Sequence, residues 1–148
     1  MKNSKLLCIG VLILFPILAF SQEISKMDRA KNIVAAVNQK DAKLYIENFT
    51  KDVKIYMYGE DGTFDLKVDG IEALYKNRAA HLKKHPDVRN EIQHLAEIDN
   101  RIVMHDKIWL TPKHKEPSNI VEIFTFDKSG KISRVDVLQQ SNLFSQEQ

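Results

Sequence analysis

The sequence has 148 residues, with 22 lysines and arginines against 20 acidic residues and a formal net charge of +2. This near balance argues against a nucleic-acid-binding domain, which needs a clustered positive surface. The single cysteine, Cys8, lies in the N-terminal apolar run. The rest of the chain therefore has no disulfide, thiol nucleophile or cysteine-based metal site.

Residues 1–21 have the pattern of a cleavable secretory signal. Two lysines precede an apolar run over residues 6–20, and Ala19 and Ser21 are the small residues that precede a cleavage site. A membrane anchor is the alternative, but a span needs roughly 20 apolar residues, and Pro16 interrupts this shorter run. We expect an exported protein, periplasmic or secreted, without a membrane attachment once the signal is removed.

Residues 22–148 predict one domain in which helices come first. Ser25 and Asp28 form a capping-box pattern at the start of a helix with apolar residues at helical spacing. Asp41 suits the N-cap of a short second helix that carries Leu44, Tyr45 and Phe49. After a strand over 52–58, a turn over 59–62 and a brief strand over 63–68, Gly70 opens a third helix that runs to about residue 84, before Pro86.

Four β-like runs follow, over residues 88–97, 101–111, 119–126 and 131–140. Helices followed by a meander of long strands are typical of an α+β fold with an antiparallel sheet. The last two runs form a hairpin whose loop, Lys128-Ser129-Gly130, suits a type I turn followed by a left-handed glycine. That loop predicts a register in which Glu122 lies opposite Asp136.

Glu122 and Asp136 are the first catalytic candidates. Two carboxylates held close in a partly dry site cannot both ionise comfortably, so one pKa rises, as a general acid near neutral pH requires. The alternatives are that Arg134 neutralises the pair in a surface ladder, or that a slip of register separates the two carboxylates.

Asp106 and His105 are neighbours on one strand, so their side chains point to opposite faces. Asp106 shares its face with an apolar row, where a carboxylate needs a partner or acts as a second base. His105 shares its face with Trp109, and both are candidate ligand-binding residues. A structural or exposed histidine is the alternative.

Tyr56 and Tyr58 share one face of the strand over 52–58. They are candidates to donate hydrogen bonds to a ligand carbonyl, although aromatic residues on a sheet commonly pack. His81 and His85 have the i, i+4 spacing of metal ligands. They flank lysines at a polar helix end with no third ligand implied, and we predict no metal site.

The order of these elements resembles that of nuclear-transport-factor-2-like domains, and within them the SnoaL-like branch, related to ketosteroid isomerase and polyketide cyclases. The resembling segments are Gln39-Lys40-Asp41, Asp69-Gly70-Ile71-Glu72-Ala73-Leu74, Ser129-Gly130-Lys131-Ile132 and Val135-Asp136-Val137-Leu138-Gln139. The resemblance implies a cone-shaped curved sheet wrapped around the N-terminal helices, a ligand cavity and a homodimer.

The same resemblance assigns the acid/base role to Asp136, with Glu122 or Asp106 tuning it. The ketosteroid-isomerase base would fall near Asp65, which is one residue out of place, so classical steroid isomerisation is disfavoured. We expect a pocket protein that binds, or does cofactor-free acid/base chemistry on, a small apolar or carbonyl-containing molecule. A non-catalytic binding or dimerisation module of the cell envelope is the alternative, in which Asp136 is ion-paired or exposed.

Overall fold

The computed structural model describes residues 24–59, 61–113 and 115–139, so the predicted signal at 1–21 lies outside the described residues. The described chain contains helices α1, α2 and α3 and a six-stranded sheet. The elements are α1 (Lys26–Asn38), α2 (Ala42–Ile46), β1 (Phe49–Tyr58), β2 (Phe64–Asp69), α3 (Ile71–Lys84), β3 (Arg89–Ile98), β4 (Arg101–Trp109), β5 (Ser118–Phe126) and β6 (Ile132–Gln139).

Both predicted N-caps are present. The Ser25 hydroxyl accepts a hydrogen bond from the Asp28 backbone N–H at 3.0 Å, and the Asp41 carboxylate accepts from two backbone N–H groups of α2. These caps satisfy donors that a helix start leaves unpaired. Phe49 differs from the prediction, because α2 ends at Ile46 and Phe49 opens β1.

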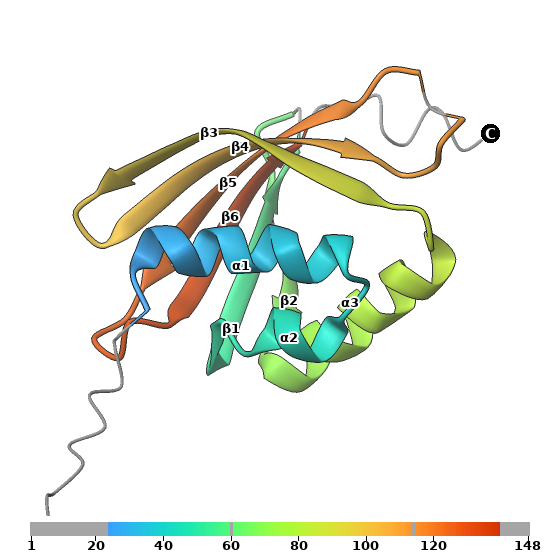
Figure 1. Cartoon of the computed structure of the whole chain (residues 1–148). Helices are drawn as coiled ribbons and strands as arrows, with labels where there is room; N and C mark the ends of the chain where they lie inside the picture. The colour runs from blue at the N-terminus through green and yellow to red at the C-terminus, as the bar shows by residue number, and fades with distance from the viewer. Residues whose placement is uncertain (1–23, 60, 114, 140–148) are drawn as a thin grey trace, which may run out of the picture.

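The strands form one curved, unclosed sheet in the order β2-β1-β6-β5-β4-β3 (Figure 1). Every neighbouring pair is antiparallel except β1 and β6, which run parallel. The sequence predicted an antiparallel sheet and did not predict this parallel pair, which joins the first strand to the last.

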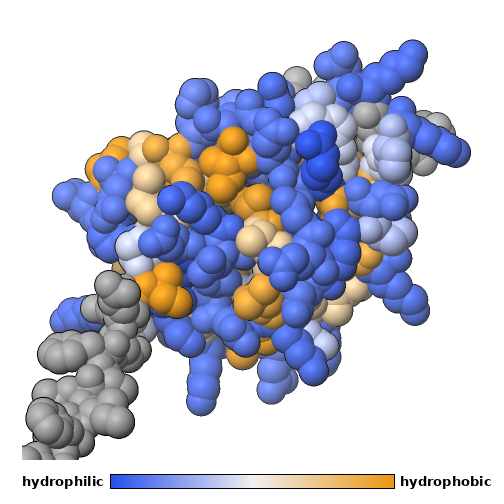
Figure 2. All heavy atoms as spheres, viewed as in Figure 1, coloured by the Kyte–Doolittle hydropathy of each residue, from blue (hydrophilic) through white to orange (hydrophobic). Residues whose placement is uncertain are grey.

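All three described helices lie on one side of the sheet, which we call the inner face (Figure 1). Helix α1 packs on β3 and β4, and α3 packs on β1 and β2. Figure 2 shows this helix-covered side, where hydrophilic side chains predominate and apolar atoms appear in separate groups. No helix in the described part of the chain is long and apolar enough to cross a membrane.

Side chains of β4 and β5 alternate between the inner face and the opposite, outer face, as the period of a strand requires. On β4, Ile102, Met104 and Asp106 share one face, as predicted, and the structure buries all three on the inner face. On β5, Glu122 shares the inner face with buried Ile120 and Phe124. The inner face therefore holds the core together with two carboxyl groups.

The β5–β6 hairpin begins in the predicted register and then departs from it. Phe126 lies opposite Ile132, as the turn predicted, but a bulge places Thr125 opposite Arg134. The bulge makes Ser133 an extra residue on β6, and one extra residue moves all later side chains to the other face.

The predicted pairing of Glu122 with Asp136 is consequently wrong. Glu122 lies opposite Val137, and Asp136 lies opposite Ile123. Because Val137 shares the inner face with Glu122, Asp136 faces outward.

Candidate interior carboxyl site

Glu122 and Asp106 lie close together on the inner face of adjacent strands. In the β4–β5 register, Glu122 is opposite Met104 and Asp106 is opposite Ile120, so the two carboxyl groups are diagonal neighbours. Asp106 is 0 % exposed, whereas Glu122 is half-buried. Glu122 is therefore the member of the pair with surface left for a ligand.

Asp106 is held by a single hydrogen bond among the described residues. The side-chain amide of Asn90 on β3 donates to Asp106 Oδ2 at 2.9 Å. The other carboxyl oxygen, Oδ1, is buried and has no hydrogen-bond partner within the described chain. A buried carboxyl with an unused oxygen is costly unless a proton or a neighbouring charge compensates it.

Arg78 on α3 provides the compensating cation. Its Nη2 donates to the Tyr45 hydroxyl at 2.8 Å, and its guanidinium carbon lies 4.2 Å from the centre of the Tyr45 ring. Tyr45 on α2 is only 2 % exposed. The positive charge of Arg78 acts on both Glu122 and Asp106 and favours their ionised forms.

Burial dominates the proton affinities of the pair. It raises the pKa of Glu122 to about 8, the negative charge of Asp106 adds to this rise, and Arg78 opposes it. Burial also raises the pKa of Asp106 to about 6, against the Asn90 hydrogen bond and the positive charges of His105 and Arg78. Between these two pH values the pair holds about one proton, which the two carboxyl groups share.

Apolar side chains surround the pair. Val137 lies opposite Glu122, Ile92 lies opposite Asp106, and Ile108 is two residues further along the same face of β4. A protonated carboxyl in such surroundings is suited to general acid–base chemistry near neutral pH.

Asp136 lies on the outer face, where it forms an ion pair with Arg134. The Arg134 Nη2 lies 2.8 Å from Asp136 Oδ1, and its Nε donates to both carboxylate oxygens at 3.0 Å. The guanidinium lies 4.4 Å from the Tyr56 ring centre. The sheet separates Asp136 from Glu122 and Asp106.

Tyr56 and Tyr58 also face outward. Tyr56 stacks on Phe64 with ring centres 4.5 Å apart, and Tyr58 lies against the same ring at 4.7 Å. Asp65, near the position of the ketosteroid-isomerase base, is exposed and forms an ion pair with Lys67 at 2.9 Å. Tyr56, Tyr58 and Phe64 pack together on the outer face, whereas Asp65 lies opposite Met57 on the other side of these strands.

His105 and Trp109 share the outer face of β4. His105 Nε2 lies 3.0 Å from Asn119 Oδ1, and its ring centre is 5.8 Å from that of His94. The guanidinium of Arg89 lies 3.8 Å from the Trp109 ring centre. The predicted site residues thus divide by face: Glu122 and Asp106 are neighbours on the inner face, whereas Asp136 lies opposite Tyr56 on the outer face.

His81 and His85 lie near one another on α3, with ring centres 4.9 Å apart. Within the described residues there is no group of three or more His, Cys, Asp or Glu side chains that could hold a metal ion.

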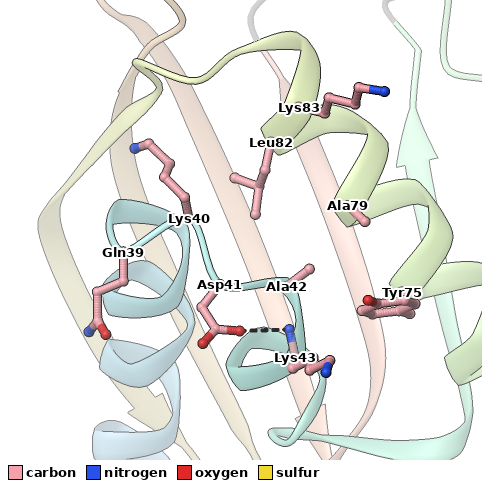
Figure 3. A pocket seen from close by; sticks show the side chains of 9 residues that line it. All are labelled: Gln39, Lys40, Asp41, Ala42, Lys43, Tyr75, Ala79, Leu82 and Lys83. Atoms are coloured by element: carbon pink, nitrogen blue, oxygen red, sulfur yellow. Dashed lines mark hydrogen bonds between the residues drawn. The ribbon is translucent and has the colours of Figure 1, made fainter.

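A surface groove of about 520 Å³ lies between the α1–α2 turn and the C-terminal half of α3 (Figure 3). Leu82, Ala79 and Tyr75 line it from α3, and Ala42 and Lys43 line it from α2. None of the predicted site residues lines this groove.

Three residues of the site, Arg78, Tyr45 and Asn90, were not predicted from the sequence as functional groups. One signal for Arg78 was present, because it shares a side of its helix with buried Leu74 and Leu82. A cation in an apolar stripe commonly needs an anionic partner. Nothing in the local sequence connects Asn90 with Asp106.

Comparison with known proteins shows the family and the fold of this chain. The SnoaL-like domain model matches residues 30–135. Three solved structures share the fold at TM-scores of 0.64 to 0.65. No match was found among curated protein sequences.

The first of these structures is an uncharacterised cystatin-fold protein from Novosphingobium aromaticivorans, with 24% identity over 76% of this chain and 97% of that one. The second is a nuclear-transport-factor-2-like protein from Cytophaga hutchinsonii, with 11% identity over 84% and 98%. The third is SalBIII, an epoxide hydrolase/cyclase-like enzyme of pyran ring formation in the polyether salinomycin, with 20% identity over 79% and 92%.

The curved α+β sheet has the nuclear-transport-factor-2-like, cystatin-like fold. Within that class, the chain belongs to the SnoaL-like domain family.

Proposed function

We propose that this protein uses Glu122 for cofactor-free acid–base chemistry on a small apolar molecule that carries a carbonyl or ether oxygen. One observation carries the proposal: a carboxyl with a pKa raised to about 8 lies half-buried on the inner face, beside a second buried carboxyl and a cation. Such a group is protonated at neutral pH and can give a proton to a ligand oxygen.

The proposed reaction needs only the proton that the pair holds. The Glu122 carboxyl donates its proton to the ligand oxygen, and the resulting carboxylate accepts a proton from a ligand carbon or from water. Asp106 stays ionised behind it and raises the proton affinity of Glu122, while Arg78 limits the total negative charge. Isomerisation, cyclisation and hydrolysis can all proceed through such a cycle.

We give the acid/base role to Glu122 rather than to Asp136. Asp136 is on the outer face in an ion pair with Arg134, opposite Ile123 rather than beside Glu122. The epoxide hydrolase/cyclase-like activity of SalBIII is a reaction of the proposed type, although a fold shared at 20% identity does not assign it to this chain.

The proposal is tested by comparing the rates at which wild-type and Glu122→Gln proteins turn over test substrates. A small apolar epoxide and an unsaturated ketone are suitable probes, with product followed by chromatography. Glutamine keeps the shape of the side chain but cannot exchange a proton, so turnover should disappear. Glu91→Gln, an exposed change on β3, is the matched control. Equal turnover by wild type and Glu122→Gln would overturn the assignment.

The second candidate function is a non-catalytic binding or dimerisation module. Two observations favour it: Asp136 is ion-paired, as this alternative requires, and the outer face is uncovered by the described helices. That face exposes four large apolar side chains on β1, β2 and β6, which are Tyr58, Phe64, Leu66 and Leu138 at 41 to 44%. Exposed groups of this kind commonly mark an interface.

A homodimer through this outer face therefore remains a proposal, and sedimentation equilibrium tests it. Phe64→Glu places a charge among the exposed apolar residues and should yield a monomer. Lys67→Glu on the same strand is the control. A wild-type protein that sediments as a monomer would contradict the dimer.

Export also remains a proposal and rests on residues 1–21 alone. Mass spectrometry of the protein from its native source should give a mature chain that begins at Gln22. A chain that retains residues 1–21 would contradict cleavage.

A further inference from the structure

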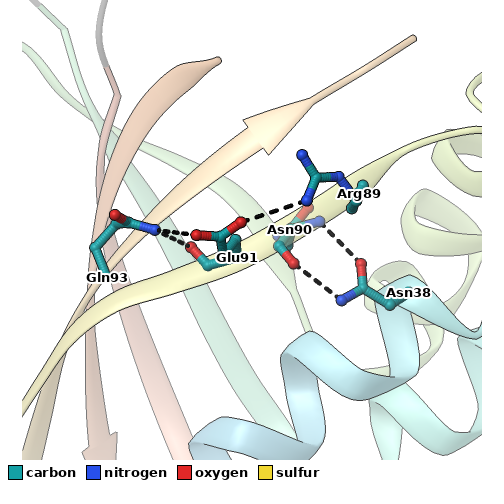
Figure 4. Close-up of polar contacts among 5 residues, drawn as sticks. All are labelled: Asn38, Arg89, Asn90, Glu91 and Gln93. Carbon is teal, nitrogen blue, oxygen red and sulfur yellow. Dashed lines mark hydrogen bonds and ion pairs between the residues drawn. The ribbon is translucent and has the colours of Figure 1, made fainter. Parts of the chain in front are cut away.

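Asn38 makes an unusual contact with the sheet edge. It is the last residue of α1, and its side-chain amide forms two hydrogen bonds with the backbone of Asn90 on β3 (Figure 4). Asn38 Nδ2 donates to the Asn90 carbonyl at 2.9 Å, and the Asn90 N–H donates to Asn38 Oδ1 at 2.9 Å. A carboxamide has the donor and acceptor of a peptide group, so Asn38 acts here as one residue of an extra strand.

This contact uses groups that an edge strand leaves open. β3 is the last strand of the sheet, so one row of its backbone donors and acceptors has no strand partner. Asn38 pairs with the open backbone groups of one residue in this row, Asn90. The position of Asn90 is thereby fixed relative to α1 as well as to β4.

The second link runs from Asn90 into the interior site. Its side-chain amide donates to Asp106 Oδ2 at 2.9 Å. Asp106 is 0 % exposed, and its Oδ1 has no partner within the described residues. The Asn90 amide is therefore the contact that orients this carboxyl.

We propose that Asn38 is a positioning residue of the interior site, which acts through Asn90 to hold Asp106 against Glu122. The inference rests on the proposed function of that pair. Without Asn38, the Asn90 backbone loses both of its hydrogen bonds to α1, and we expect the Asn90 amide to be less firmly oriented toward Asp106. A purely structural role would instead secure the sheet edge without affecting the carboxyl groups.

Several charged groups surround Asp106 and set the background for a titration test. Glu122 faces it from β5 and Arg78 from α3, His105 is its neighbour on β4, and Tyr45 on α2 accepts a hydrogen bond from Arg78. On α1, which packs on β3 and β4, the side chain of Arg29 is also buried. None of these groups changes when Asn38 or Asn90 is replaced.

Carbon-13 NMR titration of the Asp106 and Glu122 carboxyl carbons tests the inference on the purified chain without its signal. Because the Asn90 hydrogen bond lowers the pKa of Asp106, Asn90→Ala should raise the Asp106 midpoint by about one pH unit. Asn38→Ala should raise it in the same direction by about half a unit or more. The double variant should equal Asn90→Ala, since both changes break one chain of contacts.

Two further variants keep the test decisive. Asn38→Ser is too short to make both hydrogen bonds and should reproduce the shift if Asn38→Ala folds poorly. Asn32→Ala, an asparagine change elsewhere on α1, should leave both midpoints unchanged. Thermal unfolding of each variant separates a loss of stability from a shift in titration.

The possible failures are distinguishable. Asp106 and Glu122 midpoints near 4 in the wild type would contradict the proposed function itself. Raised wild-type midpoints that Asn38→Ala and Asn38→Ser leave unchanged, while Asn90→Ala shifts them, would overturn only the role of Asn38. A double variant whose shift exceeds that of Asn90→Ala would show that Asn38 acts by another route.

Discussion

Glu122 and Asp106 are diagonal neighbours across β4 and β5, with Met104 opposite the first and Ile120 opposite the second. Both carboxyl groups lie on the face that the helices cover, and burial raises the pKa of each. Two acids on one apolar face, one buried and one half-buried, reduce stability when both ionise. We interpret them as a pair that shares a proton for function.

The pH dependence of stability follows from this pair. The ordinary pKa values of Glu122 and Asp106 are 4.5 and 3.8, and folding raises them to about 8 and about 6. The folded state then holds more protons than the unfolded state between pH about 4 and about 8. The free energy of unfolding should therefore fall as pH rises through this window, by at most about 1.4 kcal/mol per pH unit for each proton.

Glu122→Gln should remove most of that dependence. Glutamine has no proton to lose, so the variant should be more stable than the wild type at pH 8 and above, and nearly equal to it below pH 4. Urea unfolding at several pH values measures the difference, with Glu91→Gln as an exposed control. A wild-type curve that matches the Glu122→Gln curve across the window would contradict a buried, protonated Glu122.

Asp106→Asn should lower the pKa of Glu122. The negative charge of Asp106 raises that pKa, and asparagine removes the charge while keeping the shape. The Glu122 carboxyl titration should move toward acid by an amount that NMR can resolve, without returning to 4.5, because burial remains the larger cause. An unchanged Glu122 midpoint would show that the two carboxyl groups do not interact.

Arg78→Met should have the opposite effect on proton affinity. Removing the guanidinium takes away the cation that lowers the pKa of both carboxyl groups, so both midpoints should rise. The Tyr45 hydroxyl also loses its hydrogen bond, which should cost roughly 1–3 kcal/mol of stability. Tyr45→Phe is the control, because it removes the same hydrogen bond but keeps the charge. Midpoints that move equally in both variants would contradict an electrostatic role for Arg78.

Asp136→Asn tests the sequence-based assignment of Asp136 as the acid/base residue, which the observed β5–β6 register does not support. The outer-face ion pair with Arg134 is partly exposed, so its loss should cost about 1 kcal/mol or less. Turnover should stay within twofold of the wild-type rate. The Glu122 titration midpoint should stay within about 0.2 pH unit of the wild-type value. Abolished turnover in a folded Asp136→Asn protein would restore Asp136 as the acid/base residue.

The sequence predicted local features of this fold well. The N-caps at Ser25 and Asp41 depend on residues three positions apart or fewer. The inner-face position of Asp106 depends only on strand alternation, which the apolar row of β4 makes visible.

The β5–β6 register could not be predicted in the same way. The turn residues fix the first pair, Phe126 and Ile132, but the bulge at Ser133 has no signature in the local sequence. Because the bulge shifts the register by one residue, Val137 lies opposite Glu122 in place of the predicted Asp136. The approach of Arg78 and Asn90 likewise depends on packing between distant elements, which spacing along the chain does not contain.

The titration of the Glu122 carboxyl carbon by NMR in the wild-type protein tests the central claim most directly. We predict a midpoint of about 8 for Glu122, with Asp106 at about 6. A carboxyl that is ionised at neutral pH could not serve as the proposed proton donor. A Glu122 midpoint near its ordinary value of 4.5 would therefore contradict the claim.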